Sequence, residues 1–167
     1  MESMTDELQL DRYHDDTVDT IYGEMVQLFV ETHQDLEGNA FYTTDRFEAF
    51  FVKQRAHEGF ELVTARVGGR LVGVVFGFVE IPVKQYALCE IMVSPEYQRR
   101  GIAKRMHDEL LRLRPEHRAD LYVRKDNASA QAAYKKWGWT KIGDVQPTPE
   151  APNFDELILP LPIPSEA

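Results

Sequence analysis

The sequence predicts a mixed α/β fold, because two kinds of hydrophobic periodicity alternate along its 167 residues. Apolar residues recur at helical spacing near the N-terminus and again after residue 101, whereas residues 60–93 contain runs of Val, Leu and Phe that are typical of strands. In order, the segments read β-α-α-β-β-β-α-β-α-β-β. The length suits a single domain, residues 1–167, with a hydrophobic core of its own.

The first 59 residues predict one short strand and two helices. The strand covers Leu8 to Tyr13, and Asp15 or Asp16 caps the helix that follows. The second helix begins near Thr44 or Asp45. The apolar stripes consist of Val18, Ile21, Tyr22, Met25, Leu28 and Phe29 in the first helix, and of Phe47, Phe50 and Phe51 in the second.

The connection between these helices, THQDLEGNAFYT, spans residues 32–43 and holds Gly38 and Asn39 as turn formers. It is either a substrate lid or a plain link. Asp35 and Glu37 lie within it, so a lid would present acidic side chains to a substrate.

The middle of the chain predicts three strands. Residues 60–81 form two of them, joined by Gly68-Gly69, which supplies the positive φ angles of a tight hairpin turn. Pro82 ends the second strand. The third, YALCEIMV at residues 86–93, is apolar on both faces except for Glu90, which predicts a buried central strand.

The C-terminal part alternates helix and strand. One helix carries Ile102, Met106, Leu110 and Leu113 and stops before Pro115; a short strand, residues 121–124, follows. Asn127 caps the next helix, residues 128–137, and Gly138 ends it. A strand then begins at Trp139, and six of the nine prolines lie from Pro147 onward, so the tail is extended, with NFDELIL as an edge strand.

Composition excludes several classes of protein. A net charge of −9 argues against nucleic acid as the main partner. No apolar run approaches the roughly 20 residues that span a bilayer, and the polar N-terminus is not a secretory signal, so we expect no membrane partner. The single cysteine, Cys89, fits a cytoplasmic location. The five histidines show no metal-ligand spacing, so we expect no metal.

Four cations and one glycine follow the central strand, in QRRGIAKR at residues 98–105. A helix N-terminus presents unpaired N–H groups and a positive dipole end, which together form an anion site. Gly101 has no side chain to keep a phosphate away from the backbone. The stretch is therefore either a polyanion site or a solvated basic helix start. No Walker loop or GxGxxG motif is present, which excludes the two commonest phosphate loops.

The loop resembles the (Gln/Arg)-x-x-Gly-x-(Gly/Ala) motif with which GNAT-family N-acetyltransferases hold the pyrophosphate of acetyl-CoA. Downstream, Asn127, Ala130, Tyr134, Gly138 and Trp139 follow that family's order and spacing. The resemblance covers residues 60–143. It implies a central mixed, mostly antiparallel sheet of six to seven strands flanked by about four helices. It also divides the chain into an acceptor-specificity half (1–59), an acetyl-CoA-binding core (60–143) and a proline-rich segment (144–167).

The resemblance also implies roles for individual residues. The central strand meets the pantetheine arm and the acetyl carbonyl, and a backbone N–H there stabilises an oxyanion. The loop holds the pyrophosphate. The following helix lines the far side of the sulfur, and Tyr134 protonates the leaving thiolate. The cofactor-binding residues are then Ile91, Met92, Val93, Gln98, Arg99, Arg100, Gly101, Ile102, Ala103, Lys104, Asn127, Ala130 and Tyr134.

Glu90 is the candidate general base, because desolvation in an apolar strand raises the pKa of a carboxyl group into a useful range. Some family members place the base further back, where this chain has Ala87. Strand alternation puts Glu90 on the face opposite Cys89, Ile91 and Val93 unless a bulge intervenes. A structural carboxylate paired with an arginine or a backbone group is the alternative. A water chain, Asp35, Glu37 or Tyr42 could then serve as base, whereas Cys89 reads as an unreactive apolar cysteine.

The function expected from the resemblance is acetyl transfer from acetyl-CoA to a primary amine by direct attack in a ternary complex. The acceptor is a small molecule or a peptide amine, and the chain is a monomer or a homodimer. Two alternatives stay open: a non-catalytic acyl-CoA-binding sensor with the same fold, and a transferase with an oxygen acceptor or a longer acyl group.

Overall fold

The computed structural model describes residues 7–34, 39 and 42–164. Its elements follow the predicted order, with two short 3-10 helices added. The strands are β1 (Leu8–Tyr13), β2 (Glu61–Val67), β3 (Arg70–Glu80), β4 (Gln85–Val93), β5 (Arg118–Arg124), β6 (Thr140–Val145) and β7 (Phe154–Pro160). The α-helices are α1 (Tyr22–Thr32), α2 (Thr44–Arg55), α3 (Ile102–Leu111) and α4 (Ala128–Lys136), and the 3-10 helices are η2 (Val18–Ile21) and η5 (Pro95–Tyr97).

The strands form one sheet in the order β1-β2-β3-β4-β5-β7-β6. Every neighbouring pair is antiparallel except β4 and β5, which run parallel. The β2–β3 turn at Gly68-Gly69 has positive φ at both residues, as expected. The predicted mixed, mostly antiparallel sheet is confirmed. The connection at residues 35–38 and 40–41, with Asp35, Glu37 and Gly38, lies outside the described residues.

The proline-rich tail does not form an edge strand, contrary to expectation. β7 lies between β5 and β6 and pairs antiparallel with both, so β6 is the edge. The α4 crossover sets β6 one strand away from β5, and β7 fills that space, where it satisfies backbone groups on both sides. Leu157 and Leu159 of β7 are each 5% exposed, which accounts for its inner position.

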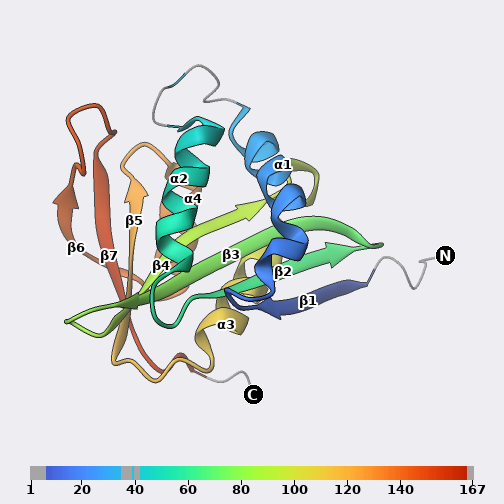
Figure 1. Cartoon of the computed structure of the whole chain (residues 1–167). Coiled ribbons are helices and arrows are strands. Elements are labelled where there is room, and N and C mark those ends of the chain that lie inside the picture. The colour runs from blue at the N-terminus through green and yellow to red at the C-terminus, as the bar shows by residue number, and fades with distance from the viewer. Residues whose placement is uncertain (1–6, 35–38, 40–41, 165–167) are drawn as a thin grey trace.

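Helices α1 and α2 cover one face of the sheet, and α3 and α4 cover the other (Figure 1). Two separate apolar cores result. The first joins α1 and α2 to the sheet through residues such as Met25, Phe51 and Phe76. The second joins α3 and α4 to it through residues such as Met106, Leu110 and Trp139. A functional group in the middle of the sheet is therefore shielded from both sides.

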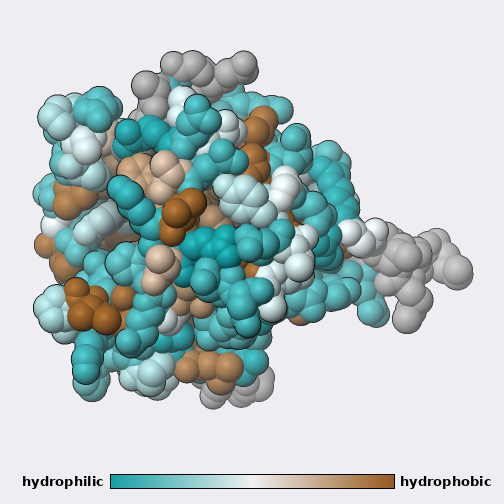
Figure 2. Space-filling view, viewed as in Figure 1, coloured by the Kyte–Doolittle hydropathy of each residue, from teal (hydrophilic) through white to brown (hydrophobic). Residues whose placement is uncertain are grey.

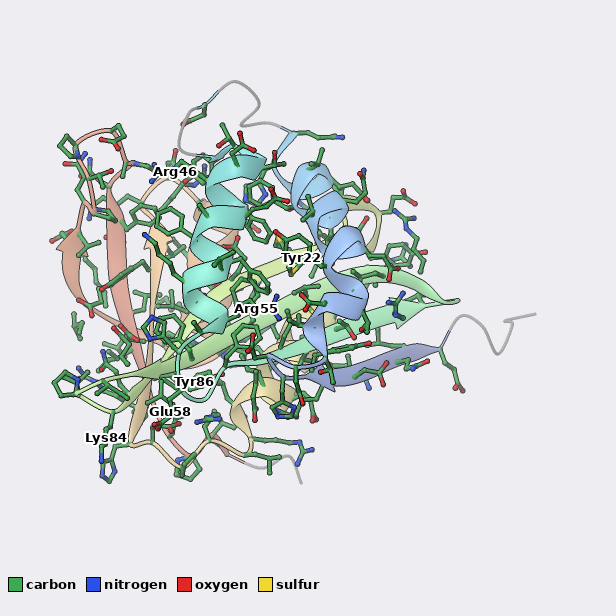
Figure 3. The ribbon with its side chains drawn as sticks, in the orientation of Figure 1. Tyr22, Arg46, Arg55, Glu58, Lys84 and Tyr86 are labelled. Atoms are coloured by element: carbon green, nitrogen blue, oxygen red, sulfur yellow. The ribbon has the colours of Figure 1, made fainter. Side chains whose placement is uncertain are left out.

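The capping prediction for the first helix was wrong. No side-chain hydrogen bond caps η2 or α1 within the described chain. Asp15 instead pairs with Arg55 at the end of α2, at 2.6 Å from Oδ1 to Nε, and Asp19 accepts from the same guanidinium at 2.6 Å. Arg55 is labelled in Figure 3. These contacts join the segment before α1 to the end of α2, whereas a cap would have joined residues within one helix. Thr43 caps α2, because its Oγ1 accepts from Arg46 N at 3.1 Å.

Two apolar residues lie outside their predicted stripes. Phe50 is 44% exposed, because the buried face of α2 runs through Phe47 and Phe51 and the guanidinium of Arg46 covers the Phe50 ring from the solvent side. Leu113 is 60% exposed, because α3 ends at Leu111. On the face shown in Figure 2, hydrophobic residues form small separate patches among hydrophilic ones.

The central strand contains a β-bulge. Phe76 of β3 lies opposite Glu90, but the next residue, Gly77, lies opposite Leu88, so Cys89 has no partner across the ladder. Cys89 therefore shares the α1/α2 face with Glu90, whereas Leu88 packs on the α3/α4 side. A Cβ atom at Gly77 would lie 2.4 Å from the Ala87 carbonyl oxygen and 2.5 Å from the Tyr86 ring. The bulge thus requires glycine at this position.

We expect Gly77→Ala to destabilise the protein by about 1–3 kcal/mol, because the added methyl group must displace backbone as well as a buried ring. The matched control is Gly23→Ala in α1, where a Cβ would meet nothing within 4 Å. That change should be neutral or stabilise by up to about 1 kcal/mol. Urea unfolding of both variants measures the difference, and equal stabilities would contradict the role given to Gly77.

Candidate active site

Strands β4 and β5 separate soon after they meet. Only Tyr86 pairs with Ala119 and Ala87 with Asp120, although β4 runs to Val93 and β5 to Arg124. From Leu88 onward β4 has no partner strand on its β5 side within the described residues, and this divergence of the two strands is called the opening below. Unpaired backbone N–H and C=O groups at such an opening can bind an extended ligand much as a missing strand would.

The loop after β4 prepares an anion site. The Gln98 side-chain amide donates to Val93 O at 3.0 Å and so anchors the loop to the end of the strand. Arg99 and Gly101 have left-handed backbones, with φ of 64° and 79°. An arginine in this region costs about 1 kcal/mol, which marks the loop as constrained.

Gly101 is the N-cap residue of α3, and no side-chain hydrogen bond caps this helix in the described chain. The first backbone bond at this end runs from Arg105 N to Gly101 O at 3.2 Å. The N–H groups of Ile102 and Ala103, in the first turn of the helix, thus have no intrahelical acceptor. A Cβ atom at Gly101 would meet nothing within 4 Å, so space lies open beside them. A phosphate group fits this arrangement.

The cations of the loop differ in their contacts. Arg100 lies over the Tyr97 ring at 5.0 Å, and Arg70 of β3 lies over the same ring at 5.5 Å. Lys104 Nζ pairs with Asp108 Oδ2 at 2.7 Å, one turn along α3. Of the predicted loop residues, Ile102 is buried in the second core and Ala103 packs against it. These two therefore offer only backbone groups to a ligand.

The predicted strand residues fall on both faces. Val93 and Ile91 belong to the α3/α4 side, whereas Met92 is 2% exposed within the α1/α2 core. The side chain of Met92 is therefore turned away from α3 and its loop. Met92 can therefore contribute only backbone groups to a site formed with Ile91 and Val93.

Helix α4 is closed at both ends as predicted. Asn127 Oδ1 accepts from Ala130 N at 3.1 Å at the N-terminus. At the C-terminus, Trp139 N donates to Tyr134 O at 3.0 Å and Gly138 N donates to Lys135 O at 3.2 Å, with φ of 103° at Gly138. This pair of bonds is a Schellman motif. The Tyr-x-x-x-Gly-Trp spacing thus holds Tyr134 in a defined place at the end of α4.

The ring of Tyr134 is packed by Trp137 and Trp139, at centroid distances of 5.6 and 6.0 Å. The Trp139 indole donates to His107 Nε2 at 3.0 Å, and His107 Nδ1 lies 2.8 Å from Asp108 Oδ1. A buried chain of hydrogen bonds therefore joins α3 to the end of α4. Loss of solvation raises the pKa of the Tyr134 phenol, and the charge of Glu90 raises it further. Tyr134 is thus protonated at neutral pH.

Glu90 lies in the opening between β4 and β5, on the α1/α2 face. Loss of solvation raises the pKa of its carboxyl group to about 7. Its side chain remains 31% exposed, so a solute can reach it. His33 Nε2, at the end of α1, lies 3.9 Å from Glu90 Oε1. The ion-pair partner that the described chain provides for Glu90 is thus a histidine, not the arginine or backbone group of the structural alternative.

Three groups gather beside Glu90, and sequence reasoning assigned no role to two of them, His33 and Arg124. His33 stacks on Phe29 at 4.1 Å and on Tyr42 at 5.7 Å. Arg124, at the end of β5, lies 5.4 Å from the Tyr42 ring centre. Tyr42 was named only as a substitute base, and burial raises the pKa of its phenol. The sequence does contain a signal, because His33 and Tyr42 lie near the two ends of the connection between α1 and α2. No local pattern links this pair to Glu90.

Two other titratable groups lie close by. Asp120 of β5, opposite Ala87, is 3% exposed, and loss of solvation together with Glu80 raises its pKa to about 8. Its burial makes it a poorer base for an incoming substrate than the reachable Glu90. Burial also raises the pKa of the Cys89 thiol, with the charge of Glu90 adding to the effect. Such a thiol is a weak nucleophile.

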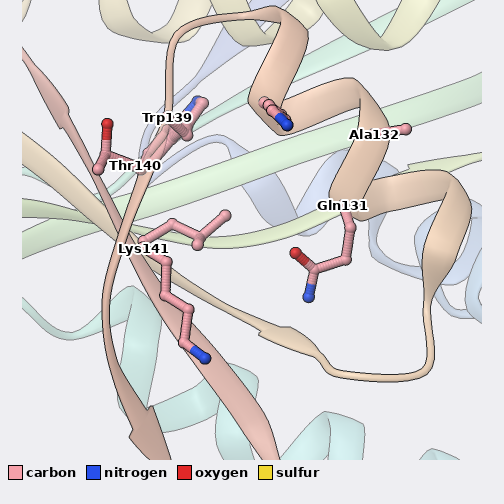
Figure 4. Close-up of a pocket in the computed structure, with 7 residues that line it drawn as sticks. Gln131, Ala132, Trp139, Thr140 and Lys141 are labelled. Carbon is pink, nitrogen blue, oxygen red and sulfur yellow. The ribbon is translucent and has the colours of Figure 1, made fainter.

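A separate hollow of about 480 Å³ lies between α4 and the β6–β7 pair (Figure 4). Its lining consists of Gln131, Ala132, Lys135, Trp139, Thr140, Lys141 and Leu157. None of the predicted site residues lines it. Within the described ranges, no three His, Cys, Asp or Glu side chains are grouped to hold a metal ion. None of the helices described for this chain has the length and apolar character to cross a membrane.

Comparisons with known proteins agree with this geometry. The acetyltransferase (GNAT) family matches residues 22–139. The N-alpha-acetyltransferase RimI of Mycobacterium tuberculosis is 32% identical over 131 residues, which are 77% of this chain and 83% of that protein.

Two solved structures share the fold. The ribosomal-protein-S18-alanine N-acetyltransferase of Escherichia coli superposes with a TM-score of 0.70 at 20% identity, covering 96% of this chain and 97% of its own. The PaiA N-acetyltransferase of Thermoplasma acidophilum, solved in complex with coenzyme A, gives a TM-score of 0.65 at 13% identity, covering 93% and 99%.

We expect Gly101→Glu to abolish binding of coenzyme A, because its side chain enters the open space at the start of α3 with the wrong charge. Gly101→Ala is the matched control, since it carries the same left-handed backbone strain without the carboxylate. In isothermal titration, Gly101→Glu should bind coenzyme A at least about tenfold more weakly than Gly101→Ala. Equal binding by the two variants would place the anion elsewhere.

Proposed function

This chain belongs to the GNAT family of acetyltransferases and is an acetyl-CoA-dependent N-acetyltransferase, and we propose that its acceptor is the α-amine at the N-terminus of a polypeptide. The observation that carries the proposal is the 32% identity with an N-alpha-acetyltransferase across most of both chains. The E. coli structure named above, an alanine N-acetyltransferase, has the same fold over 96% of this chain.

The strength of the base supports an α-amine over a lysine side chain. Glu90, with its pKa raised to about 7, is closely matched to an α-ammonium group, whose pKa is about 8. A lysine ammonium, with a pKa of about 10.4, is a weaker acid by more than two units. Proton transfer to Glu90 is therefore far less unfavourable from an N-terminus.

The acetyl-CoA site in this proposal follows the opening between β4 and β5. The N–H groups at the start of α3, with Gly101 beneath them, bind the pyrophosphate. The backbone of residues 91–93 lies along the pantetheine arm and the acetyl carbonyl. Tyr134 lies across the opening near the sulfur, held by the Schellman motif. The acceptor approaches Glu90 from the α1/α2 face, beside the stacked rings of His33 and Tyr42.

The chemistry balances with two proton-transfer groups. Glu90 removes one proton from the ammonium, and the free amine attacks the thioester carbonyl. The carbon–nitrogen bond forms, the carbon–sulfur bond breaks, and the thiolate takes the phenolic proton of Tyr134. The second proton lost by the nitrogen returns to the phenolate. One proton is released in total, and no covalent enzyme intermediate is needed.

A thiol-release assay with paired peptides tests the proposal. One peptide carries a free α-amine and an internal lysine, and the other has the same sequence with its α-amine blocked. We expect transfer to the first peptide alone, at the N-terminus. Transfer to lysine, or only to small amines, would overturn the acceptor assignment, and binding of acetyl-CoA without turnover would favour the non-catalytic alternative.

Replacement of Tyr134 by Phe should lower kcat by about 100-fold and leave the affinity for acetyl-CoA nearly unchanged, because only the general acid is lost. Steady-state kinetics and thermal-shift titration measure the two effects. Tyr13→Phe on β1 is the control and should behave like the wild type. A Tyr134→Phe variant with full activity would remove the phenol from the mechanism.

Replacement of Glu90 by Gln should lower kcat/KM near neutral pH and remove the ionisation near pH 7 from the acidic side of the pH profile. The stability of the variant should not fall with its activity, and we expect it to be equal to or higher than that of the wild type. The folded protein keeps a proton on Glu90 that the unfolded chain loses above pH 4.5, so stability falls as pH rises from about 4.5 to 7. A glutamine at position 90 does not ionise, so the variant avoids this loss of stability.

Glu90→Gln should therefore unfold at an equal or higher temperature than the wild type at pH 7.5. If Glu90 were a structural carboxylate, the variant would be less stable and the acidic side of its pH profile would stay in place.

A further inference from the structure

His33 lies at the end of α1 with its imidazole directed at Glu90. Nε2 is 3.9 Å from Glu90 Oε1, and the side chain is 15% exposed. The ring is held on both flat faces, by Phe29 at 4.1 Å and by Tyr42 at 5.7 Å, with interplanar angles of 24° and 26°. The imidazole is therefore oriented by its neighbours and not free to rotate away.

The other ring nitrogen determines the tautomer. His33 Nδ1 lies 2.9 Å from Phe29 O, and a carbonyl oxygen can only accept. Thr32 donates its hydroxyl to the same carbonyl at 3.2 Å, which leaves a lone pair of Oγ1 for Nδ1–H at 3.0 Å. Nδ1 thus carries the hydrogen, and in neutral His33 the lone pair of Nε2 faces the carboxyl group.

A lone pair on Nε2 and an ionised carboxylate repel each other, so a proton between them stabilises the pair. We propose that His33 is the relay partner of Glu90, receiving the proton that Glu90 takes from the acceptor ammonium and passing it to solvent. This inference rests on the proposed function, in which Glu90 is the base. It assigns His33 a positioning role, since His33 acts through Glu90 and not on the substrate.

The transfer balances as follows. The ammonium proton moves to a Glu90 oxygen, leaving a neutral amine and a carboxylic acid. Once Nε2 of His33 and the Glu90 oxygen close from 3.9 Å to a hydrogen-bond distance of about 3 Å, that proton moves to Nε2. This step restores the carboxylate and forms an imidazolium whose Nδ1–H bond to Phe29 O stays in place. The imidazolium lies at the C-terminal end of α1, where the helix dipole favours a positive charge. Release of the proton to solvent completes the cycle.

The charged and titratable neighbours come from four elements. Cys89 of β4, Tyr134 of α4 and Tyr42 each interact electrostatically with Glu90. Arg124 of β5 lies beyond Tyr42. Cys89 and the two phenols are neutral near pH 7, because burial raises their pKa values. These three groups therefore do not exchange protons with the Glu90 carboxyl group, whose pKa is raised to about 7, and the imidazole of His33 is the partner that the relay uses.

Long-range proton–nitrogen NMR tests the pair without any substrate. His33→Asn identifies the His33 signals by their loss. We expect the Nδ1–H tautomer for neutral His33, and its titration midpoint should move to lower pH in Glu90→Gln, because the carboxylate no longer stabilises the imidazolium. An Nε2–H tautomer, or a midpoint unchanged by Glu90→Gln, would overturn the proposal.

Kinetics test the relay itself. With one acceptor peptide, the relay needs both an ionised Glu90 and a neutral His33. The limiting acidic slope of log(kcat/KM) should therefore be lower by about 1 in His33→Phe than in the wild type, with activity at pH 7 reduced about tenfold. Phenylalanine keeps the stack on Phe29 and Tyr42. His33→Asn should lose the same slope while keeping a donor for Phe29 O.

The control is His14→Asn, which removes the imidazole of another histidine–carboxylate pair, 3.4 Å from Glu61 on the far side of the sheet. It should retain the wild-type slope. An unchanged slope in both His33 variants would overturn the relay, even with reduced activity, because a purely structural histidine lowers activity without altering the proton count. If the wild type transfers no acetyl group, the proposed function fails, which distinguishes that result from failure of the relay alone.

Discussion

The separation of β4 from β5 is the constraint on which the rest of the site depends. These are the only parallel neighbours among the described strands, and they stay paired for two residues before they diverge. Because they run parallel, their carboxyl ends lie at the same edge, where α3 begins after one and α4 after the other. Ligands of open α/β sheets bind at such an edge. The opening, the anion site of α3 and the tyrosine of α4 are thus consequences of one feature of the topology.

The bulge at Cys89 shapes the surroundings of Glu90. It turns Cys89 to the face of Glu90, whose carboxyl group lies 3.9 Å from His33. Loss of solvation raises the pKa of that carboxyl group to about 7. A carboxyl group placed for stability alone would have a strong hydrogen-bonded cation. Several carboxylates elsewhere do, such as Glu24 with Arg66 at 2.8 Å. Glu90 lies instead 3.9 Å from a histidine, which is typical of a group that must exchange its proton.

Local features of the sequence predicted most of the fold, and long-range features predicted little of it. The element order, the Gly68-Gly69 hairpin and both ends of α4 follow from patterns of a few residues. Glu90 was recognisable as a carboxylate within an apolar run. The inner position of β7 could not be predicted in this way. It depends on which strands still have an unpaired backbone edge after α4 has crossed over, and no local pattern shows that.

His33 was equally hidden, since its link to Glu90 joins residues 57 positions apart through the packing of α1 on the sheet. Asp15 shows the same limit. Its place before a helix predicts a cap, but Arg55, forty residues away, holds it. Phe50 and Leu113 were misplaced for two different reasons. Three phenylalanines in α2 leave the buried stripe ambiguous until the helix packs on the sheet, and Leu113 lies beyond Leu111, where α3 ends.

The two faces of the sheet support the direct transfer proposed above. Glu90 and His33 belong to the α1/α2 side, whereas Tyr134 and the start of α3 belong to the other, and the opening between β4 and β5 is where the two sides meet. In the proposed reaction, the amine reaches this place from one face and the thioester from the other. The thiol of Cys89 lies next to this meeting point, yet burial keeps it protonated. A protonated thiol is a weak nucleophile, so the state of Cys89 supports the proposed attack by the amine itself over transfer through a cysteine.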